Sequence, residues 1–386
     1  MSVQSGNIRF LIAGFVINLT LGVLYGWSIL IEPLEEFLNI DRSRLSIVPA
    51  TGLLFFTIGV FVHDRFTHWF RPAILASGVM LCAGLGHLLF YLYPYYLSLL
   101  IGYGIIFGIS AGVGYGLALA FARNMPLKFQ GWAVGSIVAA FAIGGMLVSI
   151  LATLFKLPEY IPNAFGITSI LFILMPLFLG TVLWRLQIQK SLRPKAVEIR
   201  DIAKTSYFLR LAFAYFAMSY IGLMIVSHGA TLMRELGISA KTASLTPFAL
   251  NAGYVFGAIL GGIVITRYPI KLIPMIFLFI SMTSLYVLQT SQTTNILFSA
   301  VFCIGLVFGS TVSIFVVLLS RCYGEDLAGD LFGRINIGYG LAGFIAPLVS
   351  AHLYELSGSY GLPIWTTIML GGLGLFALLG QTSTKQ

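Results

Sequence analysis

The side chains that could do chemistry in this sequence are polar residues inside long apolar runs. A polar group in hydrocarbon is costly enough that each one is a functional candidate by default. Most of them are Asn, Tyr and His, which offer hydrogen bonds without a fixed charge. Such a lining suits a neutral, zwitterionic or larger solute. The candidates for solute binding are Asn18, Tyr25, Trp27, Tyr115, His228, Asn251, Tyr254, Asn336 and Tyr339.

His228 is the candidate that could also carry a proton, because imidazole titrates near neutral pH. Its alternative role is a hydrogen bond between packed helices. No Asp or Glu lies in the middle of an apolar run, so proton coupling would depend on His228. Without it, the protein would exchange solutes or run by facilitated diffusion. We expect a structural role for His87.

The positions of the 13 acidic residues argue against an enzyme. All of them lie in loops or near the ends of apolar runs, so paired carboxylates and metal clusters are not expected within the membrane. Gly112, Gly114 and Gly116 lie inside an apolar run, where close helix packing explains them better than a phosphate-binding loop. We therefore expect no enzymatic activity, no cofactor and no bound metal.

The apolar runs that carry these residues predict the fold class. With 58% hydrophobic and 9% charged residues, the sequence is that of a membrane protein, since about a quarter of a soluble domain is charged. A helix needs about 20 apolar residues to cross a bilayer. The sequence therefore predicts an all-α membrane protein with twelve transmembrane helices, near residues 8–37, 45–62, 72–92, 95–122, 131–155, 163–184, 207–233, 242–266, 270–289, 293–320, 331–354 and 360–380.

The basic residues predict topology and location. Of the 22 Lys and Arg residues, cytoplasmic termini would leave outside only Arg42, Arg44, Lys156, Arg234 and Lys241. This bias follows the positive-inside rule and predicts a multi-pass protein of the inner (plasma) membrane with both termini cytoplasmic. The net charge of +9 is explained by basic side chains near anionic lipid headgroups, so we expect no nucleic-acid partner.

A basic polar segment divides the chain into two similar halves. Leu38–Ile40 and the later Ser46 match Leu236–Ile238 and Ser244 at the same spacing, and Gly104–Gly108 matches Gly305–Gly309. Repeated halves are the plan of an alternating-access transporter, in which the halves rock about a central site. We expect an N-terminal six-helix half, a cytoplasmic basic linker and a C-terminal six-helix half at residues 1–185, 186–206 and 207–386.

Several motifs along the chain carry a resemblance to a known family: Leu21–Ser28, Gly112–Gly116, Asn124 to Gly135, Gly222–His228, Glu235–Ser239 and Phe332–Gly338. They resemble motifs of the major facilitator superfamily, and within it the oxalate/formate antiporter and monocarboxylate-porter-like branch. The resemblance implies that Tyr25 and Tyr115 line a solute cavity, although an interfacial aromatic belt also explains Tyr25. Gly59 to Arg71 is similar to the superfamily's cytoplasmic loop, so Asp64 and Arg65, with Arg123, are expected to gate the conformational change.

The sequence departs from this branch where the anion would be bound. Ala258 aligns with the branch's arginine, and Ile335 to Ala351 contains no lysine, where the oxalate carriers have one. An unpaired carboxylate in a low-dielectric cavity is costly. These departures argue against a simple small carboxylate unless another cation, such as Arg123, takes the place of the arginine.

We therefore expect a secondary active transporter that moves a small organic solute by rocker-switch alternating access. The resemblance favours a monocarboxylate-like metabolite. Coupling to protons or to a counter-solute remains open, and we expect a monomer. The alternatives are a transporter of a larger or uncharged metabolite, such as a siderophore or an amino-acid-like compound, and a nutrient receptor on the same fold without net flux.

Overall fold

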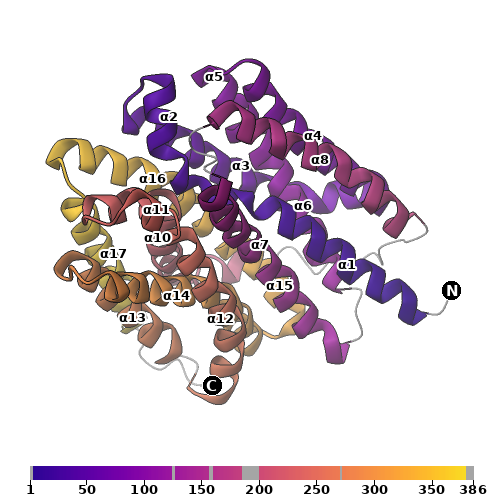
Figure 1. Cartoon of the computed structure of the whole chain (residues 1–386). Helices are drawn as coiled ribbons and strands as arrows, with labels where there is room; N and C mark the ends of the chain where they lie inside the picture. The colour runs from indigo at the N-terminus through magenta and orange to yellow at the C-terminus, as the bar shows by residue number, and fades with distance from the viewer. Residues whose placement is uncertain (1–2, 124–126, 156–159, 185–199, 270–271, 380–386) are drawn as a thin grey trace. The chain divides into compact units, whose positions relative to one another are not determined.

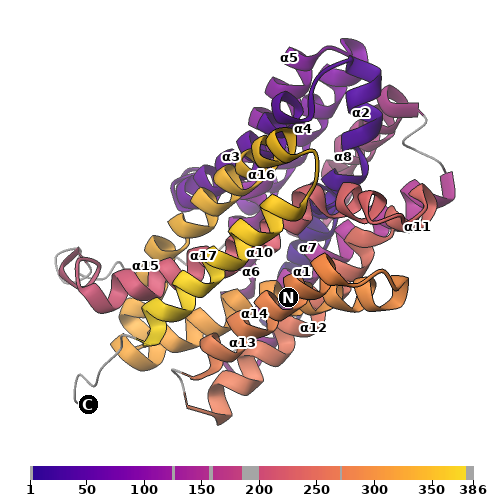
Figure 2. The same cartoon turned by 90° about the vertical axis from the view of Figure 1, so that its left-hand side faces the viewer.

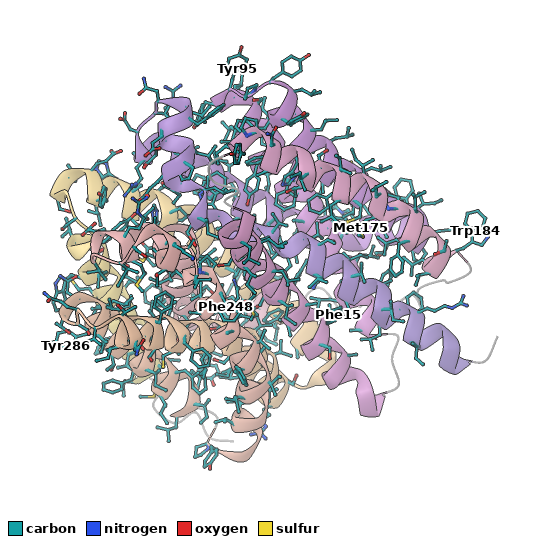
Figure 3. The ribbon with its side chains drawn as sticks, in the orientation of Figure 1. Phe15, Tyr95, Met175, Trp184, Phe248 and Tyr286 are labelled. Carbon is teal, nitrogen blue, oxygen red and sulfur yellow. The ribbon has the colours of Figure 1, made fainter. Side chains whose placement is uncertain are left out.

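The computed structural model describes residues 3–123, 127–155, 160–184, 200–269 and 272–379 (Figure 1). Within these residues the secondary structure is helical, and twelve helical spans are long and apolar enough to cross a membrane. The predicted fold class is confirmed. Aromatic side chains mark the two ends of the first half, where Tyr95 and Trp184 point outward and are 69% and 75% exposed (Figure 3), as in the aromatic belts of membrane proteins.

The contacts within the chain divide it into two units, Met1–Ser191 and Leu192–Gln386. The boundary falls inside the predicted linker 186–206. Residues 185–199 lie outside the described part of the chain, so the linker itself stays a prediction.

The first unit contains the helices that carry Tyr25 and Tyr115. In chain order they are α1 (Val3–Leu21), η1 (Gly22–Ile29), α2 (Ile31–Leu38), α3 (Arg42–Trp69), α4 (Pro72–Leu92), α5 (Tyr96–Leu99), η2 (Leu100–Phe107), α6 (Gly108–Arg123), α7 (Leu127–Phe155) and α8 (Ile161–Leu183). The helices α4 and α8 pack along each other, as do α3 and α6 (Figure 1).

The second unit contains the helices that carry His228 and Tyr254. They are α10 (Ser206–Glu235), α11 (Ala240–Ala243), α12 (Thr246–Arg267), α13 (Leu272–Thr290), α14 (Thr294–Tyr323), α15 (Glu325–Ile335), α16 (Ile337–Ser357) and α17 (Gly361–Leu379). The most extensive contact in this unit is between α12 and α14, and α10 packs against both α16 and α17 (Figure 2).

Glycines let corresponding helix pairs approach closely in the two units. A Cβ atom on Gly112 would lie 1.9 Å from the carbonyl oxygen of Phe56, so α6 and α3 are in backbone contact. In the second unit, a Cβ on Gly309 would lie 2.0 Å from the carbonyl oxygen of Tyr254, between α14 and α12. Small residues allow this approach in a membrane, where close packing replaces the hydrophobic effect as the source of helix association.

Four predicted spans are not continuous α-helices, and the eighth predicted span has a turn at 244–245, between α11 and α12. The first changes into a 3₁₀ helix at Gly22–Ile29, and the fourth contains a π-helix at Leu100–Phe107. The eleventh is interrupted at Asn336, between α15 and α16. The first change coincides with tight packing, because a Cβ on Gly22 would lie 2.1 Å from the carbonyl oxygen of Phe141 on α7.

Candidate functional site

Two predicted residues of the first half are brought together by a phenylalanine. The Tyr25 ring lies edge-on to Phe141, with centroids 4.9 Å apart, and the Tyr115 ring lies edge-on to Phe141 at 5.6 Å. Phe56 adds a fourth ring, 5.4 Å from Tyr115. We call Tyr25, Phe56, Tyr115 and Phe141 the first aromatic cluster. It joins η1, α3, α6 and α7 and offers ring faces together with two phenol groups.

Asn18 lies one helix segment before this cluster and is fully buried. Its side-chain amide donates to the carbonyl oxygen of Ile137 over 2.9 Å, which ties α1 to α7. Its Oδ1 atom has no hydrogen-bond partner in the structure. An unpaired buried acceptor is costly, so the Oδ1 atom of Asn18 is available to accept a hydrogen bond.

Trp27 does not join the first aromatic cluster. Its ring packs on Tyr103 of η2, with centroids 4.9 Å apart. The centroid of the Tyr103 ring in turn lies 5.6 Å from that of the His87 ring on α4. The atoms Trp27 Nε1, Tyr103 Oη and His87 Nε2 are all buried and lack hydrogen-bond partners in the structure. We call Trp27, Tyr103 and His87 the polar trio.

A second phenylalanine connects two predicted residues of the second half. Phe308 on α14 lies 5.2 Å from the Tyr254 ring, and the Tyr339 ring stacks on Phe308 at 6.3 Å with an interplanar angle of 4°. We call Tyr254, Phe308 and Tyr339 the second aromatic cluster. Asn251, one turn before Tyr254, donates its amide to the carbonyl oxygen of Pro247 over 2.8 Å within its own helix.

Asn336 occupies the interruption between α15 and α16. Its Oδ1 accepts a hydrogen bond from the hydroxyl group of Tyr215 over 2.9 Å, so α10 holds the eleventh span at its break. Tyr215 lies against Phe315 and Phe332 rather than in the second aromatic cluster.

His228 is fully buried, and both of its ring nitrogens have partners. Nδ1 lies 3.0 Å from the hydroxyl group of Tyr360, and Nε2 lies 3.0 Å from the carbonyl oxygen of Pro347. The Tyr360 hydroxyl is also 2.8 Å from Oγ1 of Thr231. His228 therefore links α10 to α16 and to the residue that precedes α17.

The predicted gating residues are only partly visible. Arg65 is exposed near the end of α3. The side chains of Asp64 and Arg123 lie outside the described residues, so their roles stay predictions.

Charged side chains are rare inside the described part of the chain. Its buried polar side chains are Ser, Thr, Asn and His, with no Asp, Glu, Lys or Arg among them. At the position aligned with the branch's arginine, Ala258 is buried, and its carbonyl oxygen accepts from Ser313 over 2.7 Å. Uncharged donors and aromatic rings are thus what the described interior offers a solute.

Sequence reasoning missed the residues that organise these groups. Phe141 and Phe308 resemble any other core phenylalanine in an apolar run, and no sequence signal separates them. Tyr360 lies in a short connection before the last span, where an interfacial position is the ordinary expectation. Tyr103 could have been noticed, because it lies between Gly102 and Gly104 in the repeated glycine segment.

Twelve helical spans in two contact units among the described residues are typical of a membrane transporter. The chain belongs to the Major Facilitator Superfamily, whose pattern it matches over residues 10–347. The family consists of membrane transporters, which agrees with the expected absence of enzymatic activity. The narrower branch of oxalate/formate and monocarboxylate carriers stays a prediction.

Three curated relatives show how far the sequence similarity extends. The chain is 21% identical over 343 residues to an uncharacterised MFS-type transporter of Escherichia coli (strain K12), YhjX, covering 86% of this chain and 84% of that one. It is 42% identical over 52 residues to the probable sulfoacetate transporter SauU of Cupriavidus necator, or 14% of this chain and 12% of that one. It is 27% identical over 126 residues to the benzoate transport protein of Acinetobacter baylyi, or 32% of this chain and 27% of that one.

A solved structure supports the fold independently. A bacterial homologue of the human lysosomal transporter Spinster, in an inward-facing and unoccupied conformation, superposes with a TM-score of 0.74 at 13% sequence identity. The match covers 97% of this chain and 93% of that one. At this identity the likeness concerns the fold alone.

Proposed function

We propose that this protein is a secondary active transporter that moves a small organic solute of the monocarboxylate type by rocker-switch alternating access. It acts in the inner membrane as a monomer with both termini in the cytoplasm. The observation that carries the proposal is the pair of aromatic clusters, in which Tyr25 and Tyr115, and Tyr254 and Tyr339, share one phenylalanine in each half.

The chemistry of these clusters fits an organic carboxylate with an apolar body. Phenol groups donate hydrogen bonds to a carboxylate, and bonds to a charged acceptor are stronger than those between neutral groups. The ring faces of Phe141 and Phe308 suit the apolar part of the solute. The names of two relatives support this class, since sulfoacetate and benzoate are both organic carboxylates.

A transporter of an uncharged or larger metabolite is the second candidate. Ala258 favours it, because no cation stands at the position aligned with the branch's arginine, and the buried polar side chains in the described residues are uncharged. In that case the tyrosine hydroxyl groups would bind the solute by hydrogen bonds, without a cation beside them. A siderophore or an amino-acid-like compound would fit this description.

Gating is assigned to Asp64, Arg65 and Arg123 on the basis of the family resemblance. In this proposal these residues hold one conformation closed and do not bind the solute. Two of the remaining candidates, Asn18 and Asn336, would orient the tyrosine-bearing helices. Trp27, His228 and Asn251 stay predicted solute-binding residues.

Transport of labelled solutes into liposomes containing the purified protein tests the function. Pyruvate, benzoate and sulfoacetate should enter and should compete with one another, whereas a neutral amino acid and a ferric siderophore should not. Uptake of only the neutral or bulky solutes would replace the first candidate with the second. Ligand-induced thermal stabilisation without any flux would indicate a receptor, since a ligand at ~100 times its Kd adds about 2.7 kcal/mol of stability.

A further inference from the structure

His228, Thr231 and Tyr360 form a hydrogen-bonded group that the proposed solute does not explain. We propose that these three residues are a proton-binding site that couples proton movement to solute transport. The coupling part rests on the proposed function, while the proton site can be tested without any transported solute.

Four contacts define the group. Nδ1 of His228 lies 3.0 Å from Oη of Tyr360, and Nε2 lies 3.0 Å from the carbonyl oxygen of Pro347. Oγ1 of Thr231 lies 2.8 Å from Oη of Tyr360 and donates to the carbonyl oxygen of His228 over 2.8 Å. All three residues are at most 4% exposed, so bulk solvent does not compete for these bonds.

The number of available hydrogens distinguishes the two forms of His228. The carbonyl of Pro347 only accepts, so Nε2 must carry a hydrogen. When the imidazole is neutral, Tyr360 donates its hydroxyl hydrogen to Nδ1. The hydroxyl group of Thr231 then has one hydrogen for two acceptors, the carbonyl oxygen of His228 and Oη of Tyr360, and one of these contacts has no hydrogen. With imidazolium, Nδ1 donates to Tyr360, Tyr360 donates to Thr231, and Thr231 donates to the carbonyl of His228. Only the protonated form fills all four contacts.

The surroundings of His228 make its second ring proton depend on the hydrogen bonds of the group. A buried cation is costly unless it is well hydrogen-bonded, and the contacts just described supply that compensation. Among the described contacts, the carboxylate of Glu235 at the end of α10 reaches the group. Its two oxygens accept from the backbone N–H of Tyr360 at 2.9 and 3.1 Å. On α16, the Tyr354 ring lies against the Tyr360 ring, with centroids 4.7 Å apart and the planes tilted by 39°, and His352 and Glu355 are exposed.

The position of Tyr360 relative to α10 therefore controls the proton. If Tyr360 moves away, the imidazolium loses its Nδ1 acceptor and releases the proton. If Tyr360 returns, a proton is bound again. Because Glu235 holds the backbone of Tyr360 and His228 holds its hydroxyl, a shift of α17 against α10 is enough to switch the site.

Nitrogen NMR of ¹⁵N-histidine-labelled protein in nanodiscs tests the proton site directly. One histidine signal should have both ring nitrogens protonated on the acidic side of a titration and one on the alkaline side, and His228→Gln should remove it. Tyr360→Phe should reduce the doubly protonated population at a given pH. The exposed His352, changed to Gln, and the exposed Tyr286, changed to Phe, are matched controls that should leave this signal unaltered. A His228 signal with a single protonated nitrogen throughout the titration overturns the proposal.

Transport under an imposed pH gradient tests the coupling. The wild-type protein should accumulate solute and move protons, recorded with a pH dye inside the liposomes. His228→Gln and Tyr360→Phe should lose gradient-driven accumulation but retain solute exchange. Gradient-driven accumulation that persists in both folded variants contradicts the coupling. Absence of any solute flux in the wild type would instead contradict the proposed function, with the NMR titration still deciding the proton site.

Discussion

At the scale of single residues, the hydroxyl groups of buried tyrosines have different proposed roles, in solute binding or in packing alone. Tyr25 and Tyr115 have rings fixed against Phe141, so removing their oxygens leaves the ring packing in place. Tyr103, by contrast, carries a buried hydroxyl without a partner in the structure. The same Tyr→Phe change should therefore weaken solute binding at Tyr25 and Tyr115 but raise the stability of the fold at Tyr103.

Changing Tyr25 or Tyr115 to Phe should weaken solute binding while keeping the ring packing on Phe141. A lost hydrogen bond to a charged acceptor costs about 1.5–3 kcal/mol, which is roughly 10- to 150-fold in Kd. Binding isotherms with the transported solute measure the effect, and Tyr286→Phe in the second half is the control. Unaltered affinity in both variants would exclude these tyrosines from the solute site.

Changing Tyr103 to Phe should stabilise the folded protein. The substitution keeps the ring that packs on Trp27 and removes an unpaired buried hydroxyl, whose desolvation costs about 1–3 kcal/mol. The melting temperature in detergent should rise above that of both the wild type and Tyr286→Phe. A lower melting temperature would mean that the hydroxyl has a partner, such as a bound water.

At the scale of helices, the sequence predicted the elements well and their internal geometry poorly. Twelve apolar runs of bilayer length had only one stable form, because lipid leaves no alternative partner for the backbone. The changes at Gly22 and Leu100 to 3₁₀ and π geometry depend on which helix packs there, and that information lies elsewhere in the chain. For the same reason the candidate tyrosines could be named, but not the phenylalanines that join them.

Changing Gly112 to Ala should disrupt the contact between α6 and α3. Its new Cβ would lie 1.9 Å from a backbone carbonyl oxygen, and overpacking of this kind costs typically about 1–3 kcal/mol. Gly78→Ala on α4 is the matched control, since a Cβ there meets nothing within 4 Å, and it should gain up to about 1 kcal/mol of helix propensity. Equal melting temperatures for the two variants would contradict the assigned close contact.

At the scale of the whole molecule, the two units repeat the same helix packing, as the proposed rocker-switch mechanism requires. Corresponding glycine segments, Gly104–Gly108 and Gly305–Gly309, pack against the second long helix of their own half. Each half is therefore stiffened internally by backbone contacts. The proposed solute and proton sites use different side chains, although α16 contributes Tyr339 to the first and the carbonyl of Pro347 to the second.

Changing Asp64 to Asn should slow the transport cycle and leave solute affinity nearly unchanged, if this residue gates the conformational change. Turnover from flux measurements and Kd from binding measurements, both made on the same preparation, separate the two effects. Asp41→Asn, at the residue immediately before α3, is a control with the same charge change. Normal turnover in Asp64→Asn would remove it from the gate.

The 3₁₀ segment at Gly22–Ile29 makes the first span longer and more tightly wound than an α-helix of the same residues would be. A 3₁₀ helix rises about 2.0 Å per residue and an α-helix about 1.5 Å, so rewinding these 8 residues as α-helix would shorten the span by about 4 Å. It would also turn everything beyond the segment by roughly 160° relative to Asn18. The winding of this segment therefore sets the directions in which Tyr25 and Trp27 face relative to Asn18.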